Sequence, residues 1–484
     1  MDLKQISYIA SKHTRKLSTI GATVILFSYS QLVAADNTIP AAGQISAGNI
    51  APQQELPALD GTVIAPTLNN VPENLTINQA VQRAVEWHPD IATAVGKLMQ
   101  SADSVDIAKA KYYPQINGGI DNGWSSTSNN HKFNPSINLS VSQMLYDFGK
   151  VSSSVRAAQA GVAQQQASVL VSIDNVAHDT ASTLIQVQEY QKLTVIAQEQ
   201  LTALEKIGAL ARERNDEGAT ALSDTTQTDA RIEGARSTLT QYQSALETSR
   251  TILSADLGWP AVMQISDDFP IKLLKSCQIA KPDDRLNPSV LAAWAQANQA
   301  QAQLDNANAQ TLPTISLEPQ VTHYLTNNFP DSQQLDRTQY SAYVKVQMPL
   351  YQGGALTAGR NAAAHALNSA NAMVRSAQLT SKQKLSQAQT QALSLLTSLN
   401  ILERQQKLSE QTQQLYEDQY LQLGSRDLLD VLNAEQEVFQ ARFAYQQTLS
   451  QLRSLQLDCL YNSGMLRSAF NLNNQRIQSV EIQP

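Results

Sequence analysis

Two patterns of hydrophobic residues alternate along this 484-residue chain, one with a period of two and one with helical spacing. The period of two is clearest in three stretches of about ten residues each. Their apolar members are Ile137, Leu139 and Val141, then Ile315, Leu317 and Val321, and finally Tyr340, Ala342, Val344, Val346 and Met348. Such alternation predicts β-strands with one apolar and one polar face, as in a transmembrane barrel or in a half-buried soluble sheet.

The helical spacing extends over two long segments, which end at Gly218 and Gly424 and are each followed by a shorter helical segment. The first long segment, 149–218, covers 69 residues (218 − 149), or about 100 Å of helix. Its return segment, 218–258, gives only about 60 Å, and a helix of about 24 residues before the strands adds about 36 Å. We therefore expect each long helix to pack against two shorter helices placed end to end.

The two halves of the chain repeat the same order of elements. His88-Pro89 matches Asn287-Pro288 at an offset of 199 (288 − 89), and Gly218 matches Gly424 at an offset of 206 (424 − 218). An internal repeat of this length indicates a duplicated fold. The organisation that we predict is a signal peptide (1–35), a disordered leader (36–74), a first structural repeat (75–265), a linker (266–286), a second structural repeat (287–467) and a C-terminal tail (468–484).

Neither the strands nor the long helices are expected to be stable in an isolated chain. Four strands of this kind are expected per chain, and about eight are needed to close a barrel, whereas open strand edges are not tolerated in lipid. Either the strands form a soluble sheet, or several chains share one barrel. The helices carry narrow stripes at seven-residue spacing, such as Val155, Val162 and Val169, or Leu408 and Leu415, which is typical of coiled coils. Since such long helices need lateral neighbours, we expect a ring of hairpins that forms a tube.

The N-terminus has the order of a secretory signal. Lys12, Arg15 and Lys16 precede an apolar segment, 17–33, and the small residues Ala34-Ala35 follow where a signal peptidase would cut. An uncleaved membrane anchor is the alternative, but the apolar segment is short and interrupted. No cysteine follows the cleavage site, so the sequence does not predict a lipoprotein.

Composition and scattered chemical groups argue against an enzyme or a nucleic-acid-binding protein. Aromatic residues make up 6% and charged residues 16% of the chain, which suits helix-on-helix packing better than a thick globular core. The net charge is −7, no basic stripe occurs, and no HExxH, P-loop or GxSxG motif is present. We expect no catalytic residues, metal or cofactor.

Cys277 and Cys459 are expected to be free thiols, with a disulfide in an oxidising compartment as the alternative.

These features resemble the TolC-like outer-membrane channels of Gram-negative bacteria, over about residues 75–467. The resemblance is carried by the duplicated plan, by Leu-Tyr-Asp-Phe-Gly at 145–149 and Leu-Tyr-Gln-Gly-Gly at 350–354, and above all by Gly-Ser-Arg-Asp-Leu-Leu-Asp-Val-Leu-Asn-Ala at 424–434. It implies an α+β membrane protein, a homotrimer in which four strands per chain form a twelve-stranded β-barrel in the outer membrane. The barrel would continue into a long α-helical coiled-coil tunnel in the periplasm. The implied partners are a periplasmic adaptor protein, an inner-membrane transporter and outer-membrane lipid, but no nucleic acid.

The same resemblance implies a gate at the hairpin tips, where Gly218 and Gly424 would make the turns. Family aspartates that follow the second turn surround the narrowest point of the tunnel. Asp430 stands at the first of these positions and Asn433 at the second, so one acidic ring is expected to be missing. Three copies of Asp430 in a closed ring would repel one another and attract cations.

The resemblance also implies a contact between the two hairpins. Arg426 matches a residue that pairs with a Ser/Thr-Asp of the opposite hairpin, here Ser223 and Asp224, and we call this contact the latch. Leu421 stands near the place of a tyrosine that the family can use in the latch, whereas Tyr420 is one residue away. On sequence pattern alone, ordinary helix-start charges are the favoured interpretation, because negative charge suits the helix dipole there, and only the resemblance favours the gate and the latch.

Three functions fit this architecture. The favoured one is the exit channel of a type I secretion system, because segments 218–236 and 428–437 are similar to family members that serve the secretion of large surface adhesins. The absence of a lipoprotein cysteine favours it too, and the alternative is the outer-membrane channel of a multidrug or metal efflux pump. A periplasmic hairpin adaptor is the third possibility, but an adaptor needs only one hairpin and no lipid-facing strands.

Overall fold

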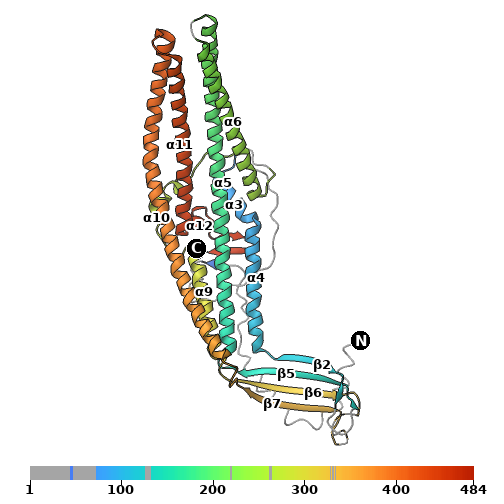
Figure 1. Ribbon diagram of the computed structural model, residues 1–484. Coiled ribbons are helices and arrows are strands. Elements are labelled where there is room, and N and C mark those ends of the chain that lie inside the picture. Colours follow the sequence, from blue (N-terminus) through green and yellow to red (C-terminus); the bar gives the residue numbers. More distant parts are fainter. Residues whose placement is uncertain are drawn as a thin grey trace.

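The computed structural model describes residues 44–46, 72, 74–125, 132–218, 221–260, 264–327, 329, 332 and 334–483. The predicted signal peptide, 1–35, lies outside the described residues. Figure 1 shows an elongated molecule in which a long helical bundle ends at a small sheet. Within the described part of the chain, no helix combines the length and the apolar character needed to cross a membrane.

In the first repeat, one long helix packs against two shorter ones, as the segment lengths predict. Helix α5 (Lys150–Asp216) lies beside α4 (Pro89–Lys109) near the sheet and beside α6 (Leu222–Leu257) farther from it (Figure 1). A short helix, α3 (Ile77–Trp87), precedes α4. Helix α4 begins with proline. In the first turn of this helix, the backbone N–H of Asp90 donates a hydrogen bond to Nδ1 of His88, which caps the helix.

The second repeat builds the same unit from α10 (Ala355–Asp418), α9 (Pro288–Ala309) and α11 (Leu428–Ser463). Asn287 caps α9 and accepts a hydrogen bond of 3.0 Å from the backbone N–H of Ser289. Helix α11 ends at Gly464, where a Cβ atom would lie only 2.5 Å from the backbone carbonyl of Leu286. Glycine is therefore required there both for its positive φ of 75° and for this close approach.

The four expected strands form one antiparallel sheet with the order β2-β5-β6-β7. Their bounds are Gln115–Asp121 for β2, Ser136–Tyr146 for β5, Thr314–Tyr324 for β6 and Thr338–Gln347 for β7. Strands β2 and β7 are the two edges of this sheet within the chain. Two further short strands, β3 (Trp124–Ser125) and β4 (Lys132–Phe133), pair with each other.

The pairing register collects the apolar residues on one face of the sheet. Leu139 is opposite Val321, which is opposite Tyr340, so that one row across three strands is apolar. The next row is polar, and its members are Asn117, Ser140, Gln320 and Ser341. Lys345 and Glu318 form an ion pair of 3.4 Å on this polar face. The sheet therefore has one surface suited to lipid and one suited to water.

The shorter helices meet end to end partway along the bundle, at a level that we call the junction. It contains α3, the small helices α7 (Ile271–Leu274), α8 (Ser276–Ile279) and α12 (Leu466–Ala469), and the strands β8 (Arg476–Ile477) and β9 (Val480–Gln483). Side chains of the C-terminal tail enter its apolar core with at most 2% of their surface exposed: Phe470, Leu472, Ile477, Val480 and Ile482.

The prediction of a disordered leader, 36–74, needs correction at one place. Residues Gln44–Ser46 form strand β1, which pairs in parallel with β9. The C-terminal strand offers an open edge at the junction, and the leader supplies backbone groups that satisfy it. Leu75 lies just after the leader and is completely buried, and it forms a bridge to Ile265. Most of the leader lies outside the described residues.

The expectation of two free thiols is wrong, because Cys277 and Cys459 form a disulfide with a Cα–Cα distance of 5.2 Å. Cys277 lies on α8 in the linker, and Cys459 is completely buried on α11. Ser276 donates a hydrogen bond of 2.7 Å to the carbonyl of Gln456, which holds α8 against α11. Tertiary packing brings together two residues that are 182 positions apart, a proximity that their sequence spacing does not indicate.

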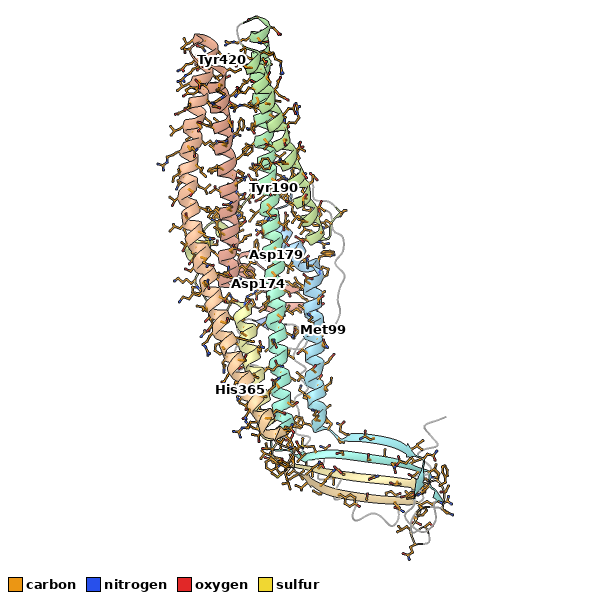
Figure 2. All side chains as sticks on the ribbon, in the orientation of Figure 1. Met99, Asp174, Asp179, Tyr190, His365 and Tyr420 are labelled. Atoms are coloured by element: carbon orange, nitrogen blue, oxygen red, sulfur yellow. A yellow bond between two sulfur atoms is a disulfide. The ribbon has the colours of Figure 1, made fainter. Side chains whose placement is uncertain are left out.

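A buried ion pair also stabilises the junction. Asp174 lies near the middle of α5 (Figure 2), and its carboxylate accepts a hydrogen bond of 2.5 Å from Arg467 of α12. Burial raises the pKa of Asp174 to about 6, and the charge of Arg467 opposes that rise, so the carboxylate is ionised at neutral pH. Arg467 also donates to the carbonyl of Leu286 at the end of the linker, so that its guanidinium connects α5, the linker and α12.

Replacing both cysteines with serine is expected to lower the thermal unfolding midpoint, because a native disulfide typically stabilises a protein by about 3 kcal/mol. Circular dichroism with and without a reductant checks this. The reductant should lower the midpoint of the wild-type protein and leave that of the Cys277→Ser/Cys459→Ser variant unchanged. Equal midpoints for the oxidised and reduced wild type would contradict a stabilising role.

Candidate functional site

The candidate site is formed by the two hairpin tips, at the end of the helical bundle away from the sheet (Figure 1). We call residues 216–224 tip 1 and residues 419–430 tip 2. Each tip joins a long helix to its shorter partner, α5 to α6 and α10 to α11. Each turns at a glycine with positive φ, 73° at Gly218 and 57° at Gly424. Both residues predicted to make the turns are therefore in the turns.

In tip 1, the predicted latch residues stand at the start of α6. Asp224 is half-buried in the first turn of the helix, where its negative charge is favourable beside free N–H groups. Ser223 is exposed and donates a hydrogen bond of 3.3 Å to the Asp224 carboxylate. Among the described residues, no ion pair includes the Asp224 carboxylate.

In tip 2, Arg426 is held by residues of its own hairpin. Its guanidinium lies 3.1 Å from the carboxylate of Asp430, one turn ahead on α11. It also donates to Gln419 over 3.0 Å and lies 4.3 Å from the ring centre of Tyr416. The side chains of Arg426 and Asp430 are 38% and 40% exposed, so that this ion pair is weak and easily exchanged.

The structure does not bring Arg426 to Ser223 or Asp224 within the described part of the chain. Arg426 and Asp430, predicted for the latch and the constriction respectively, are instead paired with each other. Within one chain, the negative charge of Asp430 is thus partly compensated. Formation of the latch, whether in one chain or between neighbouring chains, stays a prediction.

Two contacts between the hairpins involve residues that the sequence analysis did not select. Arg214, in the last turn of α5, lies 4.2 Å from the ring centre of Tyr420 and donates to its backbone carbonyl over 3.4 Å. Tyr420 is only 4% exposed and lies near the tip (Figure 2). Arg214 and Tyr420 occupy matching places in the two repeats, at an offset of 206 (420 − 214), which is the offset of the glycines.

Tyr420 belongs to a π-helical turn, η2 (Gln419–Leu423), that ends α10. A π turn holds one residue more than an α turn, and such turns are frequent at functional sites. Single-sequence patterns carry no clear sign of a π turn, so the contact of Tyr420 could not be predicted.

The second contact concerns Asn433, the predicted second constriction residue. Its side-chain oxygen accepts a hydrogen bond of 2.9 Å from Arg231 of α6. The same guanidinium donates to Gln436 over 2.6 Å and to the carbonyl of Leu432 over 3.3 Å. Asn433 therefore joins the two hairpins. No feature of the sequence distinguishes Arg231 from the other surface arginines of α6.

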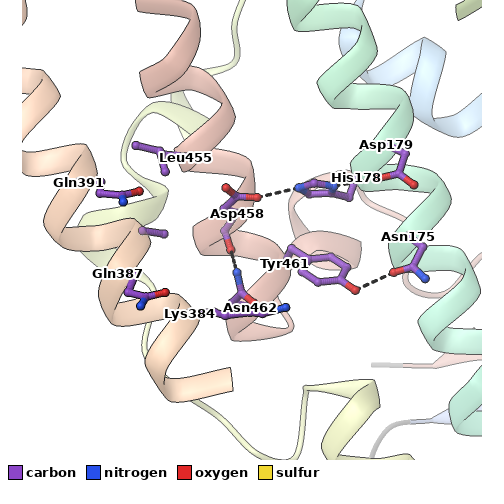
Figure 3. Close-up of a pocket in the computed structure, with 11 residues that line it drawn as sticks. Asn175, His178, Asp179, Lys384, Gln387, Gln391, Leu455, Asp458, Tyr461 and Asn462 are labelled. Carbon is purple, nitrogen blue, oxygen red and sulfur yellow. Dashed lines mark hydrogen bonds and ion pairs between the residues drawn. The ribbon is translucent and has the colours of Figure 1, made fainter. Parts of the chain in front are cut away.

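A polar cavity of about 420 Å³ lies between α5, α10 and α11 near the junction (Figure 3). On its walls, His178 lies 2.8 Å from Asp458, and the hydroxyl of Tyr461 donates to Asn175 over 2.6 Å. Burial lowers the pKa of His178, but hydrogen bonds to Asp458 and Asp179 outweigh burial and raise it overall. These contacts tie the first repeat to the second. In the part of the chain that the structure describes, no cluster of three or more metal-ligating residues is found.

Comparison with known proteins shows which proteins are similar to this chain in sequence and in fold. The sequence model described as "Outer membrane efflux protein" matches residues 80–258 and 285–458. The outer membrane efflux protein BepC of Brucella suis is 23% identical over 76% of this chain and 81% of its own length. The solved outer membrane protein VceC of Vibrio cholerae has a TM-score of 0.69 and 18% identity, over 80% of this chain and 96% of its own. The Campylobacter jejuni CmeC outer membrane channel has a TM-score of 0.67 and 14% identity, over 86% and 95%.

Arg426→Ala is expected to raise the resting ion conductance of the purified protein in a planar bilayer about fivefold, since an exposed ion pair contributes about 1 kcal/mol. The substitution removes the contacts to Asp430, Gln419 and Tyr416 that hold tip 2. Arg404→Ala is the matched control, because Arg404 bonds to a carbonyl of its own helix and, in the part of the chain that the structure describes, to no residue of the tips. Equal conductance of the two variants would show that Arg426 does not hold the entrance closed.

Proposed function

The chain belongs to the outer membrane efflux protein family, and from this premise we propose that it assembles as a trimer with one shared barrel and one tunnel. Family membership confirms the predicted location in the outer membrane of a Gram-negative cell, with the helices in the periplasm. It also confirms that the chain is a channel-forming protein of tripartite export systems and not an enzyme.

The open edges of the sheet support the trimer most directly. Strands β2 and β7 each present one row of backbone N–H and C=O groups without a strand partner among the described residues. In lipid these groups must be paired, and pairing β7 of one chain with β2 of the next satisfies both edges. Three chains of four strands then close a twelve-stranded barrel, with the apolar face outward and the polar face, including Lys345 and Glu318, toward water.

An unpartnered stripe on α10 supports the same assembly. Ile401, Leu408 and Leu415 recur every seven residues, and their side chains are 52%, 64% and 58% exposed. This spacing keeps an apolar seam on one side of a helix and is typical of coiled-coil contacts. Since the intrachain partners α9 and α11 occupy other sides of α10, the stripe fits a helix of a neighbouring copy.

We propose that the channel is the exit duct of a type I secretion system. In this role it would take unfolded protein, such as a large adhesin, from an inner-membrane ABC transporter and a periplasmic adaptor to the cell exterior. The similarity of segments 218–236 and 428–437 to channels that serve adhesin secretion supports this proposal. The alternative is the outer-membrane channel of a multidrug or metal efflux pump, which the similarity to an outer membrane efflux protein, BepC, favours.

Leu408→Glu is expected to shift the detergent-solubilised protein from trimers toward single chains, because a charge in a coiled-coil seam must be desolvated. Native mass spectrometry gives the copy number. Gln414→Glu adds the same charge to an exposed position of α10 outside the stripe and should leave the trimer intact. A trimer that tolerates Leu408→Glu as well as Gln414→Glu would show that the stripe is not an interface.

Deletion of the gene is expected to remove one or more large polypeptides from the culture medium and to leave susceptibility to drugs and metal ions unchanged. Proteomics of the medium and inhibitory concentrations of a compound panel, each with a complemented strain as control, provide the two measurements. Increased susceptibility with an unchanged set of secreted proteins would replace secretion with the efflux alternative.

A further inference from the structure

Arg231 makes the most extensive polar contact between the two hairpins near their tips. It lies on α6, seven residues (231 − 224) beyond Asp224, and donates hydrogen bonds to three acceptors within one turn of α11. The acceptors are the carbonyl of Leu432 and the side-chain oxygens of Asn433 and Gln436. A planar guanidinium can serve several acceptors at once, which a lysine ammonium on its flexible stem does less well.

All three acceptors of Arg231 are uncharged, and no ion pair among the described residues includes it. This distinguishes it from Arg426, which faces Asp430, and from Arg442, which joins the hairpins through Glu199. The positive charge of Arg231 is therefore not neutralised at close range. Hydrogen bonds from a charged donor are also stronger than those between neutral groups.

The position of Arg231 links this charge to the entrance. Its partner Asn433 lies three residues after Asp430 on α11, so the two side chains are neighbours on the same helix face. Asn433 is exposed, yet its oxygen is directed toward the guanidinium. Around a closed tunnel, three copies would place three arginine charges close to the three Asp430 carboxylates.

We propose that Arg231 is a second tie of the periplasmic entrance and a determinant of its ion selectivity. By binding Asn433, Gln436 and Leu432 it holds α6 against α11, which keeps the entrance narrow. Its uncompensated charge reduces the preference for cations that Asp430 alone would create. The inference rests on the proposed channel function and concerns the same entrance.

The test measures resting conductance and the K⁺/Cl⁻ permeability ratio of the purified trimer in planar bilayers. Arg231→Ala is expected to raise resting conductance about tenfold and to raise the permeability ratio, because it removes both the tie and the charge. Arg231→Lys should raise conductance but keep the ratio near the wild-type value, since it retains the charge and loses the planar contact. Native mass spectrometry first establishes that each variant is assembled.

The matched control is Arg236→Ala, on the same helix. Arg236 pairs with Glu233 and Glu205, both within the first hairpin, so its loss removes no contact between hairpins. If Arg231→Ala behaves like Arg236→Ala in both measurements, the proposal is overturned. If Arg231→Lys raises the permeability ratio as much as Arg231→Ala does, the charge has no part in selectivity and that half of the proposal is overturned.

Asn433→Asp gives an independent test of the contact. A carboxylate at this position would strengthen the bond from Arg231, so resting conductance should be equal to or below that of the wild type. A rise would mean that residue 433 faces the tunnel as part of an acidic ring, contrary to the proposal. A wild-type protein that does not conduct at all would instead contradict the proposed channel, whereas a conducting wild type with unaffected Arg231 variants contradicts this inference alone.

Discussion

The whole architecture depends on packing two helices of 67 and 64 residues along their entire lengths. Such long helices with narrow apolar stripes do not persist alone in water. The chain places two shorter helices end to end beside each long one, and the place where they meet becomes the junction. Helix ends bring turns and free backbone groups, so the junction needs caps, glycines and short strands. The apolar core, the disulfide and the buried Asp174–Arg467 pair all lie there.

The contacts become weaker from the junction toward the tips. At the junction the two repeats share a covalent bond, a buried ion pair and a continuous apolar core. At the tips they share a smaller buried apolar cluster, which includes Ile232 of α6 and Leu428 of α11, together with the stacking of Arg214 on Tyr420 and the hydrogen bonds of Arg231. Arg426 bonds within its own hairpin. Partly exposed polar contacts contribute little each and exchange readily. The repeats are therefore joined more firmly at the junction than at the tips.

Three arginines near the tips have chemically different partners. Arg214 faces an aromatic ring and a carbonyl, Arg231 faces neutral amides and a carbonyl, and Arg426 faces a carboxylate. Only the last pairing neutralises the charge. The electrostatic field at the entrance therefore depends on which acceptors the guanidinium groups find, and a count of acidic and basic residues at the tips does not describe it.

The sequence by itself determined the elements with regular patterns. Strand β6 follows from the alternation of Ile315, Leu317 and Val321, and the end of α11 follows from Gly464, because local geometry and side-chain period are properties of the chain itself. The turns at Gly218 and Gly424 follow for the same reason. Only the tertiary structure decided the disulfide between Cys277 and Cys459, the burial of the C-terminal tail, the π turn at Tyr420 and the partner of Asn433. These features depend on which surfaces come into contact when the two repeats pack. Residues about 200 positions apart have no local sequence pattern that indicates their contact.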